Sequence, residues 1–193
     1  MYYITLIRHG RSKWQMRGWM TSCEFAEWVR AYDAHGILEE DKIPAATLET
    51  IKKASLVISS PLPRAVQSVE RLRPSCNVKI VGWMREVEIP VPFASVRWLR
   101  LPTAVWLVLS RVCWLCGYSL DVESYREAKK RAEYAADMLC EYANRYGHIV
   151  AVGHGWFHRL VGSALKKKGW KRTASPSAKH WHAVLYTFYN RKH

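Results

Sequence analysis

Acidic residues are scarce in this sequence. Its 193 residues include 16 Asp and Glu against 30 Lys and Arg, so the formal net charge is +14. An excess of this sign favours anionic partners, such as phosphorylated metabolites, nucleic acid or an anionic membrane surface. The simpler alternative, a surface of solvated basic side chains, accounts for the charge equally well. The charge carries no information about the fold, which has to come from the pattern of residues.

Cysteine is too sparse and too scattered to form a disulfide framework. Five cysteines, an odd number, lie at positions 23, 76, 113, 116 and 140. We therefore expect reduced thiols. No basic stretch followed by an apolar one opens the chain, so we expect no secretory signal and a cytoplasmic location. Cys113 and Cys116 have the spacing of half a zinc site, but no second pair accompanies them, and we predict two buried thiols in an apolar helix.

A long uninterrupted hydrophobic run is also missing. The most apolar stretch, residues 98–118, is broken by Arg100, Pro102 and Arg111, and a membrane-spanning helix needs about 20 apolar residues. The chain has no internal repeat and no low-complexity linker, and its length suits one domain with a sizeable core. We therefore expect residues 1–193 to form a single domain that carries an unusual apolar segment at about 94–122.

Two interpretations of the apolar segment remain open. It could be a lid or core helix that covers a pocket. Alternatively, it could be an interfacial helix that associates peripherally with an anionic membrane. In that case Trp98, Trp106 and Trp114 would lie at the level of the lipid headgroups, with Arg97, Arg100 and Arg111 near anionic lipid.

Strands and helices alternate along the chain. Short β-branched and aromatic runs predict strands, and apolar residues at helical spacing predict helices. We expect strands at 2–7, 56–60, 78–82, 148–153 and 183–189, helices at 24–36, 47–53, 63–73, 123–146 and 156–168, and a basic loop at 166–179. Because the strands are continuous apolar runs, this order indicates an α/β fold, a three-layer α/β/α sandwich around a mostly parallel sheet.

Charged and titratable residues follow the predicted strands. The ligand site of such a sheet lies beyond the carboxyl ends of its strands, so these residues should converge. They are Arg8, His9 and Gly10 after the first strand, Ser59, Ser60 and Arg64 after the second, Glu86 and Glu88 after the third, and Gly153, His154 and Gly155 after the fourth.

This set of residue types suits phosphoryl transfer. Arginine binds phosphate oxygens with two parallel hydrogen bonds. A neutral imidazole is a nucleophile at pH values near 7. A carboxylic acid can protonate the leaving oxygen, and surrounding donors stabilise the charge of the transition state. Each motif alone is more often a simple turn, but their joint placement at strand ends favours a catalytic centre.

Four motifs resemble those of the histidine phosphatase superfamily, the phosphoglycerate mutase-like or histidine acid phosphatase group. They are LIRHGRS (6–12), SSPLPRAVQS (59–68), MREVEIP (84–90) and VGHG (152–155), and their order and spacing agree from residue 3 to about 165. The resemblance implies a phosphoglycerate mutase-like fold. It also implies metal-independent hydrolysis of a phosphomonoester, without a cofactor.

The resemblance also implies residue roles. His9 would be the nucleophile that becomes phosphohistidine. Arg8, Arg64 and His154 would hold the phosphate. Glu86 would give the leaving group a proton, with Glu88 as the reserve candidate.

The sequence departs from the family at several places. Arg11 stands where relatives often have an acidic residue or Gln, and its charge could favour a second anionic group on the substrate. Gln15 stands where mutase-like relatives often have Asn, so a phosphate contact there is a weaker expectation. Residues 16–50 and 94–122 also depart, and in the family such segments commonly cover the pocket and set substrate choice.

Several functional alternatives stay open at this stage. We expect a phosphatase that acts on a phosphorylated small molecule or a phosphoprotein, with a phosphomutase or a non-catalytic phospho-ligand-binding protein as alternatives. The basic stretch 166–172 could contact nucleic acid through Trp170, but no nucleic-acid-binding signature is present and we do not expect that role. His158, one helical turn after His154, could also line the pocket. His180 and His182 form too small a pair for a metal site.

Overall fold

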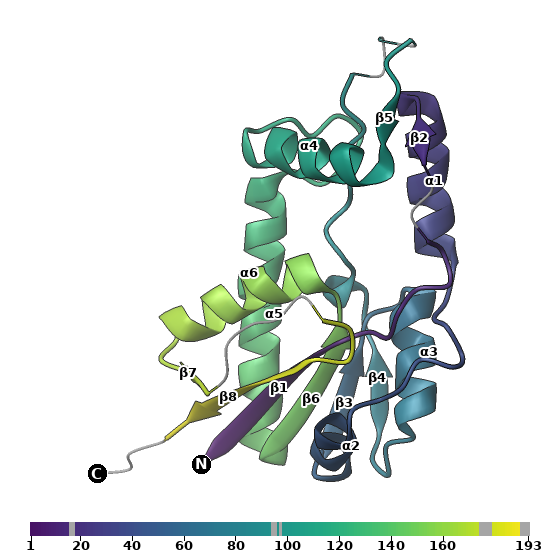
Figure 1. Cartoon of the computed structure of the whole chain (residues 1–193). Helices are drawn as coiled ribbons and strands as arrows, with labels where there is room; N and C mark the ends of the chain where they lie inside the picture. The colour runs from purple at the N-terminus through teal and green to yellow at the C-terminus, as the bar shows by residue number, and fades with distance from the viewer. Residues whose placement is uncertain (16–17, 94–95, 97, 174–178, 190–193) are drawn as a thin grey trace.

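A six-stranded sheet forms the centre of the computed structural model, which describes residues 1–15, 18–93, 96, 98–173 and 179–189. The strand order is β4-β3-β6-β1-β8-β7 (Figure 1). The first four strands in this order are parallel to one another, β8 is antiparallel to β1, and β7 is antiparallel to β8. The strands are β1 (Tyr2–Arg8), β3 (Leu56–Ser59), β4 (Val78–Ile80), β6 (His148–Gly153), β7 (Lys171–Arg172) and β8 (Ala183–Phe188). The prediction of a mostly parallel sheet is confirmed.

Helices cover both faces of this sheet. Along β1, Ile4 and Leu6 belong to a core shared with α5 (Tyr125–Tyr146) and α6 (Gly155–Lys167). Ile7, which points to the opposite face, belongs to a second core with α2 (Ala45–Lys52) and α3 (Pro63–Leu72). Successive residues of a strand face opposite sides, so one apolar strand supplies two cores. The three-layer α/β/α architecture follows directly.

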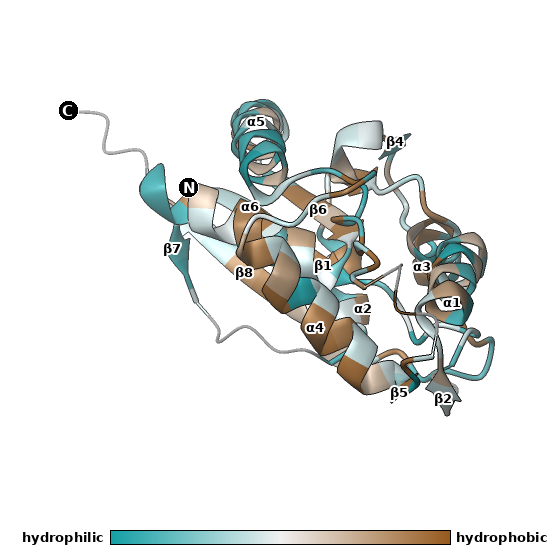
Figure 2. Cartoon of the chain, turned by 90° about the horizontal axis from the view of Figure 1, so that it is seen from above, coloured by the Kyte–Doolittle hydropathy of each residue, from teal (hydrophilic) through white to brown (hydrophobic). Residues whose placement is uncertain are grey.

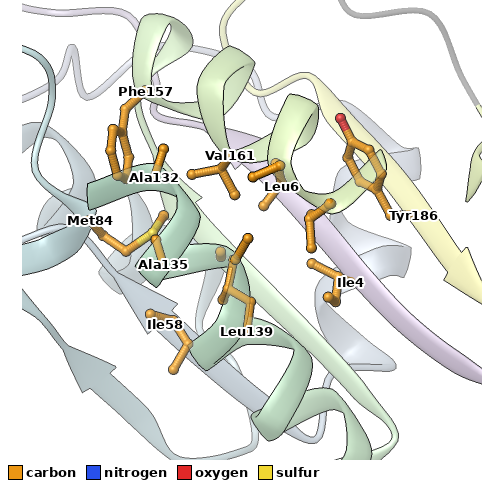
Figure 3. Close-up of a cluster of buried hydrophobic side chains, with 14 of the residues drawn as sticks. Ile4, Leu6, Ile58, Met84, Ala132, Ala135, Leu139, Phe157, Val161 and Tyr186 are labelled. Carbon is orange, nitrogen blue, oxygen red and sulfur yellow. The ribbon is translucent and has the colours of Figure 1, made fainter. Parts of the chain in front are cut away.

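The larger core lies between the sheet and α5 and α6. Figure 3 shows Ile4 and Leu6 facing Leu139 of α5 and Val161 of α6, with Phe157 beside them. Each such side chain contributes about 1.5–3 kcal/mol when it leaves water. The small alanines at α5 positions 128, 132, 135, 136 and 143 are fully buried, so this helix packs close to the sheet and to α6.

The helix boundaries have local causes that are visible in the sequence. Thr21 and Glu24 form a capping box that begins α1 (Ser22–Ala34), and Ser124 and Glu127 do the same for α5. Such reciprocal bonds satisfy backbone N–H groups that the first helical turn leaves unpaired. Pro63 begins α3 at a position where its fixed φ suits the helix. The short 3-10 helix η1 (Gly82–Met84) leads to Glu86.

The two divergent segments of the sequence pack against each other. Strand β2 (Trp19–Met20) pairs with β5 (Leu101–Pro102), and α1 lies against α4 (Thr103–Leu115). Phe25, Trp28 and Trp106 stack in a small separate core. These elements, residues 19–34 and 101–115, are called the cap unit below. They lie together in the upper part of Figure 1, apart from the strands of the main sheet.

The structure contradicts part of the interfacial-helix interpretation. Trp106, Trp114 and Arg111 are all buried, so they are not placed to meet lipid headgroups. Trp98 is exposed, and Arg97 lies outside the described residues. Among the described residues, none of the helices combines the length and hydropathy needed to cross a bilayer. The prediction of two buried thiols is wrong for Cys116, which is exposed just after the end of α4.

The basic stretch near the C-terminus is also more ordered than expected. Lys171 and Arg172, placed by sequence in a loop, form β7 and pair with β8. Trp170 is buried and packs on Phe188. Its ring is therefore not available to stack on a base. Residues 174–178 of the predicted loop lie outside the described residues.

Candidate active site

Two buried histidines meet at the carboxyl ends of β1 and β6. These strands are parallel neighbours, with Arg8 opposite Gly153, so the residues that follow, His9 and His154, are adjacent. Their ring centroids lie 5.0 Å apart, and both side chains are almost fully excluded from water. The sequence-based expectation that these strand ends converge is confirmed.

The hydrogen bond of His9 fixes its tautomer. Its Nδ1 lies 2.6 Å from the carbonyl oxygen of Gly10, which can only accept, so Nδ1 carries the hydrogen. Nε2 then holds the unshared electron pair. Burial lowers the pKa of His9 well below its ordinary value, and the charge of Arg64 lowers it further. His9 is therefore a neutral imidazole with a nucleophilic Nε2 at neutral pH.

Ser60, which directly follows β3, orients the His154 ring. Its Nε2 lies 2.8 Å from the hydroxyl oxygen of Ser60, and its Nδ1 has no hydrogen-bond partner among the described residues. Burial is the main cause that lowers the pKa of His154, followed by the neighbouring His9 and Arg64. A second neutral imidazole thus lies beside the first, and the described part of the chain leaves one of its ring nitrogens without a hydrogen bond.

Arg64 is fully buried in the first turn of α3 and is oriented by α1. Its guanidinium donates to the carbonyl oxygen of Tyr32 and, over 3.1 Å, to the Asp33 carboxylate. It also lies 4.1 Å from the centre of the Tyr32 ring. Its Nε has no partner within the described part of the chain. The sequence analysis identified Arg64 but not Asp33, whose contact depends on how the cap unit packs.

The structure distinguishes the two candidate proton donors. Oε1 of Glu86 accepts hydrogen bonds from the backbone N–H groups of Val87 (3.0 Å) and Phe157 (2.9 Å), and the side chain lines both cavities described below. Oε2 of Glu88 instead accepts from the backbone of Glu123 over 2.6 Å. Of the two carboxylates, that of Glu86 lines the cavities and that of Glu88 does not.

Two cavities meet at Arg8 and Glu86. The larger, of about 790 Å³, is called the apolar cavity. It runs from Arg11 and His180 to the cap unit, which contributes Tyr32 of α1 and Leu107 of α4 to its wall. The smaller, of about 420 Å³, is called the basic groove and lies between α6 and β8. Its cationic lining residues are Arg8, Arg159, Lys166 and Arg172.

The remaining residues singled out by sequence line these cavities. Arg11 and Gln15 are exposed at the apolar cavity. His158 lines the basic groove, where burial lowers its pKa to about 3, and its Nε2 has no partner among the described residues. Gly155 brings the backbone close to Arg8, because a Cβ there would lie 3.5 Å from Arg8 Nε.

A third histidine was missed as a site residue. The His180 ring lies 5.5 Å from that of His9, and its Nδ1 donates to the His9 carbonyl oxygen over 3.2 Å. Burial is the main cause that lowers its pKa, and the charge of Arg8 adds to it. Its place in the chain could have indicated it, because His180 just precedes β8. Since β8 runs antiparallel to β1, the residues just before β8 lie near the end of β1.

Trp181, the residue after His180, leaves no room for a side chain at position 10. A Cβ on Gly10 would lie 2.3 Å from Cζ2 of Trp181, which is far inside any carbon–carbon contact. The Trp181 indole N–H donates to Asp41 over 2.6 Å, and its backbone N–H donates to the carbonyl oxygen of Arg8 over 3.0 Å. The indole therefore packs directly against Gly10 in the loop that carries His9.

The described residues contain no group of three or more His, Cys, Asp or Glu side chains arranged to hold a metal ion. The charges around His9 are instead those of Arg8 and Arg64. Fixed cations and neutral imidazoles are the groups that bind and accept a phosphoryl group.

Comparisons with known proteins agree with this geometry. The family model of the histidine phosphatase superfamily (branch 1) matches residues 4–187. No curated protein sequence matches the chain. A solved structure of a phosphoserine phosphatase mutant from Entamoeba histolytica is similar, with TM-score 0.61, 17% identity, and coverage of 98% of this chain and 92% of that one.

Two bacterial structures are similar in fold as well. An open reading frame product of Mycobacterium tuberculosis gives TM-score 0.60 at 17% identity, over 98% of this chain and 93% of its own. A putative alpha-ribazole-5'-P phosphatase from Escherichia coli gives TM-score 0.54 at 16% identity, over 84% of this chain and 79% of its own. With a family model that spans nearly the whole chain, the conclusion is that this protein belongs to the histidine phosphatase superfamily.

Proposed function

We propose that the chain hydrolyses a phosphomonoester and that the phosphoryl group passes through a covalent intermediate on His9. The observation that carries this proposal is the state of His9, which is buried and neutral, with Nδ1–H bonded to Gly10 and an unprotonated Nε2. The phosphatases among the structural neighbours support the reaction class by analogy. In this proposal the reaction needs no metal ion.

In the first step, Nε2 of His9 forms a bond to phosphorus while the ester P–O bond breaks. Arg8, Arg64 and His154 hold the phosphoryl oxygens, where fixed donors stabilise the transition-state charge. Nε of Arg64 and Nδ1 of His154 are buried without a partner among the described residues, which supports their use as hydrogen-bonding groups toward the phosphoryl oxygens. Glu86 gives its proton to the leaving oxygen, which departs as an alcohol.

In the second step, water attacks the phosphohistidine. Glu86, now ionised, takes a proton from the water as the new P–O bond forms and the P–N bond breaks. Inorganic phosphate leaves, and His9 and protonated Glu86 are restored. Glu86 lies where it could serve both steps, because it lines the cavity that contains Arg8 and His180.

The test is hydrolysis of 4-nitrophenyl phosphate in the presence of EDTA. Wild type is compared with His9→Ala and with His148→Gln as the matched control, since His148 lies at the opposite end of β6. We expect turnover in wild type and control, and a fall of roughly 10³-fold or more in His9→Ala. Mass spectrometry after an alkaline quench should find the phosphoryl group on the His9 peptide.

The alternatives give different results in the same experiment. Binding of inorganic phosphate without any turnover would refute the proposal and favour a non-catalytic phospho-ligand-binding protein. Transfer of the phosphoryl group to an alcohol in preference to water would identify a phosphomutase.

The assignment of the proton donor has its own test. Glu86→Gln should lower kcat for alkyl phosphates by about 10²–10⁴-fold. The loss should be smaller for 4-nitrophenyl phosphate, whose leaving group needs no proton, and Glu88→Gln should retain turnover. The reverse order of the two variants would refute the role of Glu86.

A further inference from the structure

We infer that the ester taken by this site has a large apolar leaving group, which occupies the apolar cavity. The inference rests on the proposed function for the position of the phosphate. It concerns the chemistry of the rest of the substrate, for which the polar compounds named with the structural neighbours give no precedent.

The apolar cavity adjoins the residues that surround His9 and Arg64, and Arg8 lines it. His180, whose ring is 5.5 Å from His9, and Tyr32 and Asp33, which contact Arg64, all line this cavity. None of these three lines the basic groove, which meets the centre only at Arg8, Glu86 and the start of α6. A leaving group that points away from His9 therefore enters the larger space.

Along α4 and the segment after Glu86, aliphatic side chains line the apolar cavity, and Arg111 is the one charged residue among them. The aliphatic residues are Val87, Ile89, Leu107, Val108, Val112 and Leu115. A hydroxyl, amide or carboxylate held against these residues would lose its water without gaining a partner, which costs free energy. Mostly apolar walls with a few polar groups at one end are typical of a site for a small organic ligand.

Helix α4 presents an uncovered aliphatic face to this space. Val108, Val112 and Leu115 share one face of the helix and are 63%, 51% and 49% exposed. In Figure 2 several turns of α4 have the brown colour of hydrophobic residues. A contiguous set of exposed aliphatic side chains that borders a polar centre marks a binding surface. Since the set is continuous with the phosphate position, its occupant is the substrate itself.

Arg111 does not convert this wall into a second anion site. It lies in the middle of the same helix, but its two terminal nitrogens donate to the carbonyl oxygens of Val87 (3.0 Å) and Glu88 (2.6 Å). Its guanidinium lies 5.3 Å from the Trp156 ring, and burial lowers its pKa. Arg111 thus holds α4 over the segment of Glu86, and the wall beside it stays apolar.

The test is binding of n-alkylphosphonates, whose C–P bond this reaction does not cleave. Ethyl-, butyl-, hexyl- and octylphosphonate are titrated as monomers, with tryptophan fluorescence as the readout because Trp14, Trp28 and Trp156 line the cavity. We expect Kd to fall by up to about fourfold for each added methylene. A Kd that is independent of chain length, or that rises with it, would overturn the inference.

Two valines of α4 supply matched variants. Val112 lines the cavity, whereas Val105, also exposed and on the same helix, does not. Val112→Asp should abolish the gain with chain length and leave the Kd of ethylphosphonate near that of wild type, and Val105→Asp should keep the gain. Equal behaviour of the two variants would place the alkyl chain elsewhere and refute the assignment.

The binding series separates this inference from the proposed function. Chain-length-dependent binding without hydrolysis of any matching alkyl phosphate would refute the hydrolysis and support the ligand class. His9-dependent hydrolysis with no chain-length effect would refute the ligand class alone. An ester with a large apolar leaving group can be a membrane lipid or a soluble compound, and hexadecyl phosphate in phosphatidylcholine vesicles distinguishes the two. Its hydrolysis points to a lipid substrate, whereas hydrolysis of the monomeric alkyl phosphates alone points to a soluble ester.

Discussion

Gly10 lies under the Trp181 indole, and its replacement by alanine gives a sharp test of how the His9 loop is held. The new Cβ would be 2.3 Å from Cζ2 and 2.7 Å from Cε2 of Trp181. Carbon atoms in contact are about 3.5–4.0 Å apart, so the loop or the indole has to move by roughly an ångström. The Trp181 carbonyl accepts from the Thr47 hydroxyl over 2.8 Å and its indole N–H is bonded to Asp41, so the loop moves.

The expected size of the effect follows from this overlap. Overpacking in a well-packed core costs about 1–3 kcal/mol, and a misplacement of about 1 Å at a catalytic group can lower a rate roughly 10²-fold. Gly10→Ala should therefore lower both the free energy of unfolding and kcat. Gly82→Ala is the matched control, because a Cβ at Gly82 would have nothing within 4 Å.

Urea denaturation and 4-nitrophenyl phosphate hydrolysis measure the two effects separately. Trp181→Phe removes the ring atoms that cause the overlap, so the double variant Gly10→Ala/Trp181→Phe should lose less stability than the sum of the single variants. The reasoning would be refuted if Gly10→Ala unfolded with the same free energy as Gly82→Ala, or if the losses were simply additive.

Three further predictions concern charges near the site. Burial lowers the pKa of His9, so kcat/KM should stay level down through pH 6.5 and fall only in more acidic solution; an acid limb centred at or above pH 6.5 would contradict a buried neutral nucleophile. Asp33→Asn removes a carboxylate that competes with phosphate for Arg64. Inhibition by inorganic phosphate should tighten about fivefold, equivalent to a screened repulsion of roughly 1 kcal/mol, and unchanged inhibition constants would rule out this competition. The pKa of His158 is about 3, below its unfolded value of about 6.5, so the unfolded chain binds the proton first and stability is lost as the pH falls below 6.5. In urea denaturation between pH 6.5 and pH 5, wild type should lose about 2 kcal/mol more than His158→Gln, and equal slopes would disprove the buried neutral state.

The sequence alone determined the layers of the fold and which candidate site residues follow the strand ends. Continuous apolar strands such as 2–7 and 148–153 can only be buried on both faces, which requires helices on each side. Arg8, His9 and His154 follow such strands directly, and parallel strands end at a common edge. These features depend on local pattern and connectivity, and therefore the sequence was enough to predict them.

Tertiary structure decided everything that depends on contacts between distant segments. Glu86 and Glu88 are two residues apart, and only the packing of Glu123 and Phe157 against them shows which carboxylate faces the cavity. His180 reaches His9 because an antiparallel strand returns along β1, a pairing that no local pattern reveals.

The cap unit is the clearest case of tertiary control. The tryptophans and arginines of 98–118 suggested a membrane surface, yet Trp106 and Arg111 are buried against α1 and the Glu86 segment. The spacing of its apolar residues predicts an apolar helix, but it does not show which face of that helix packs against the rest of the protein. That choice depends on the pairing of β2 with β5, more than 80 residues apart in the chain, and it leaves the aliphatic face of α4 exposed beside the apolar cavity.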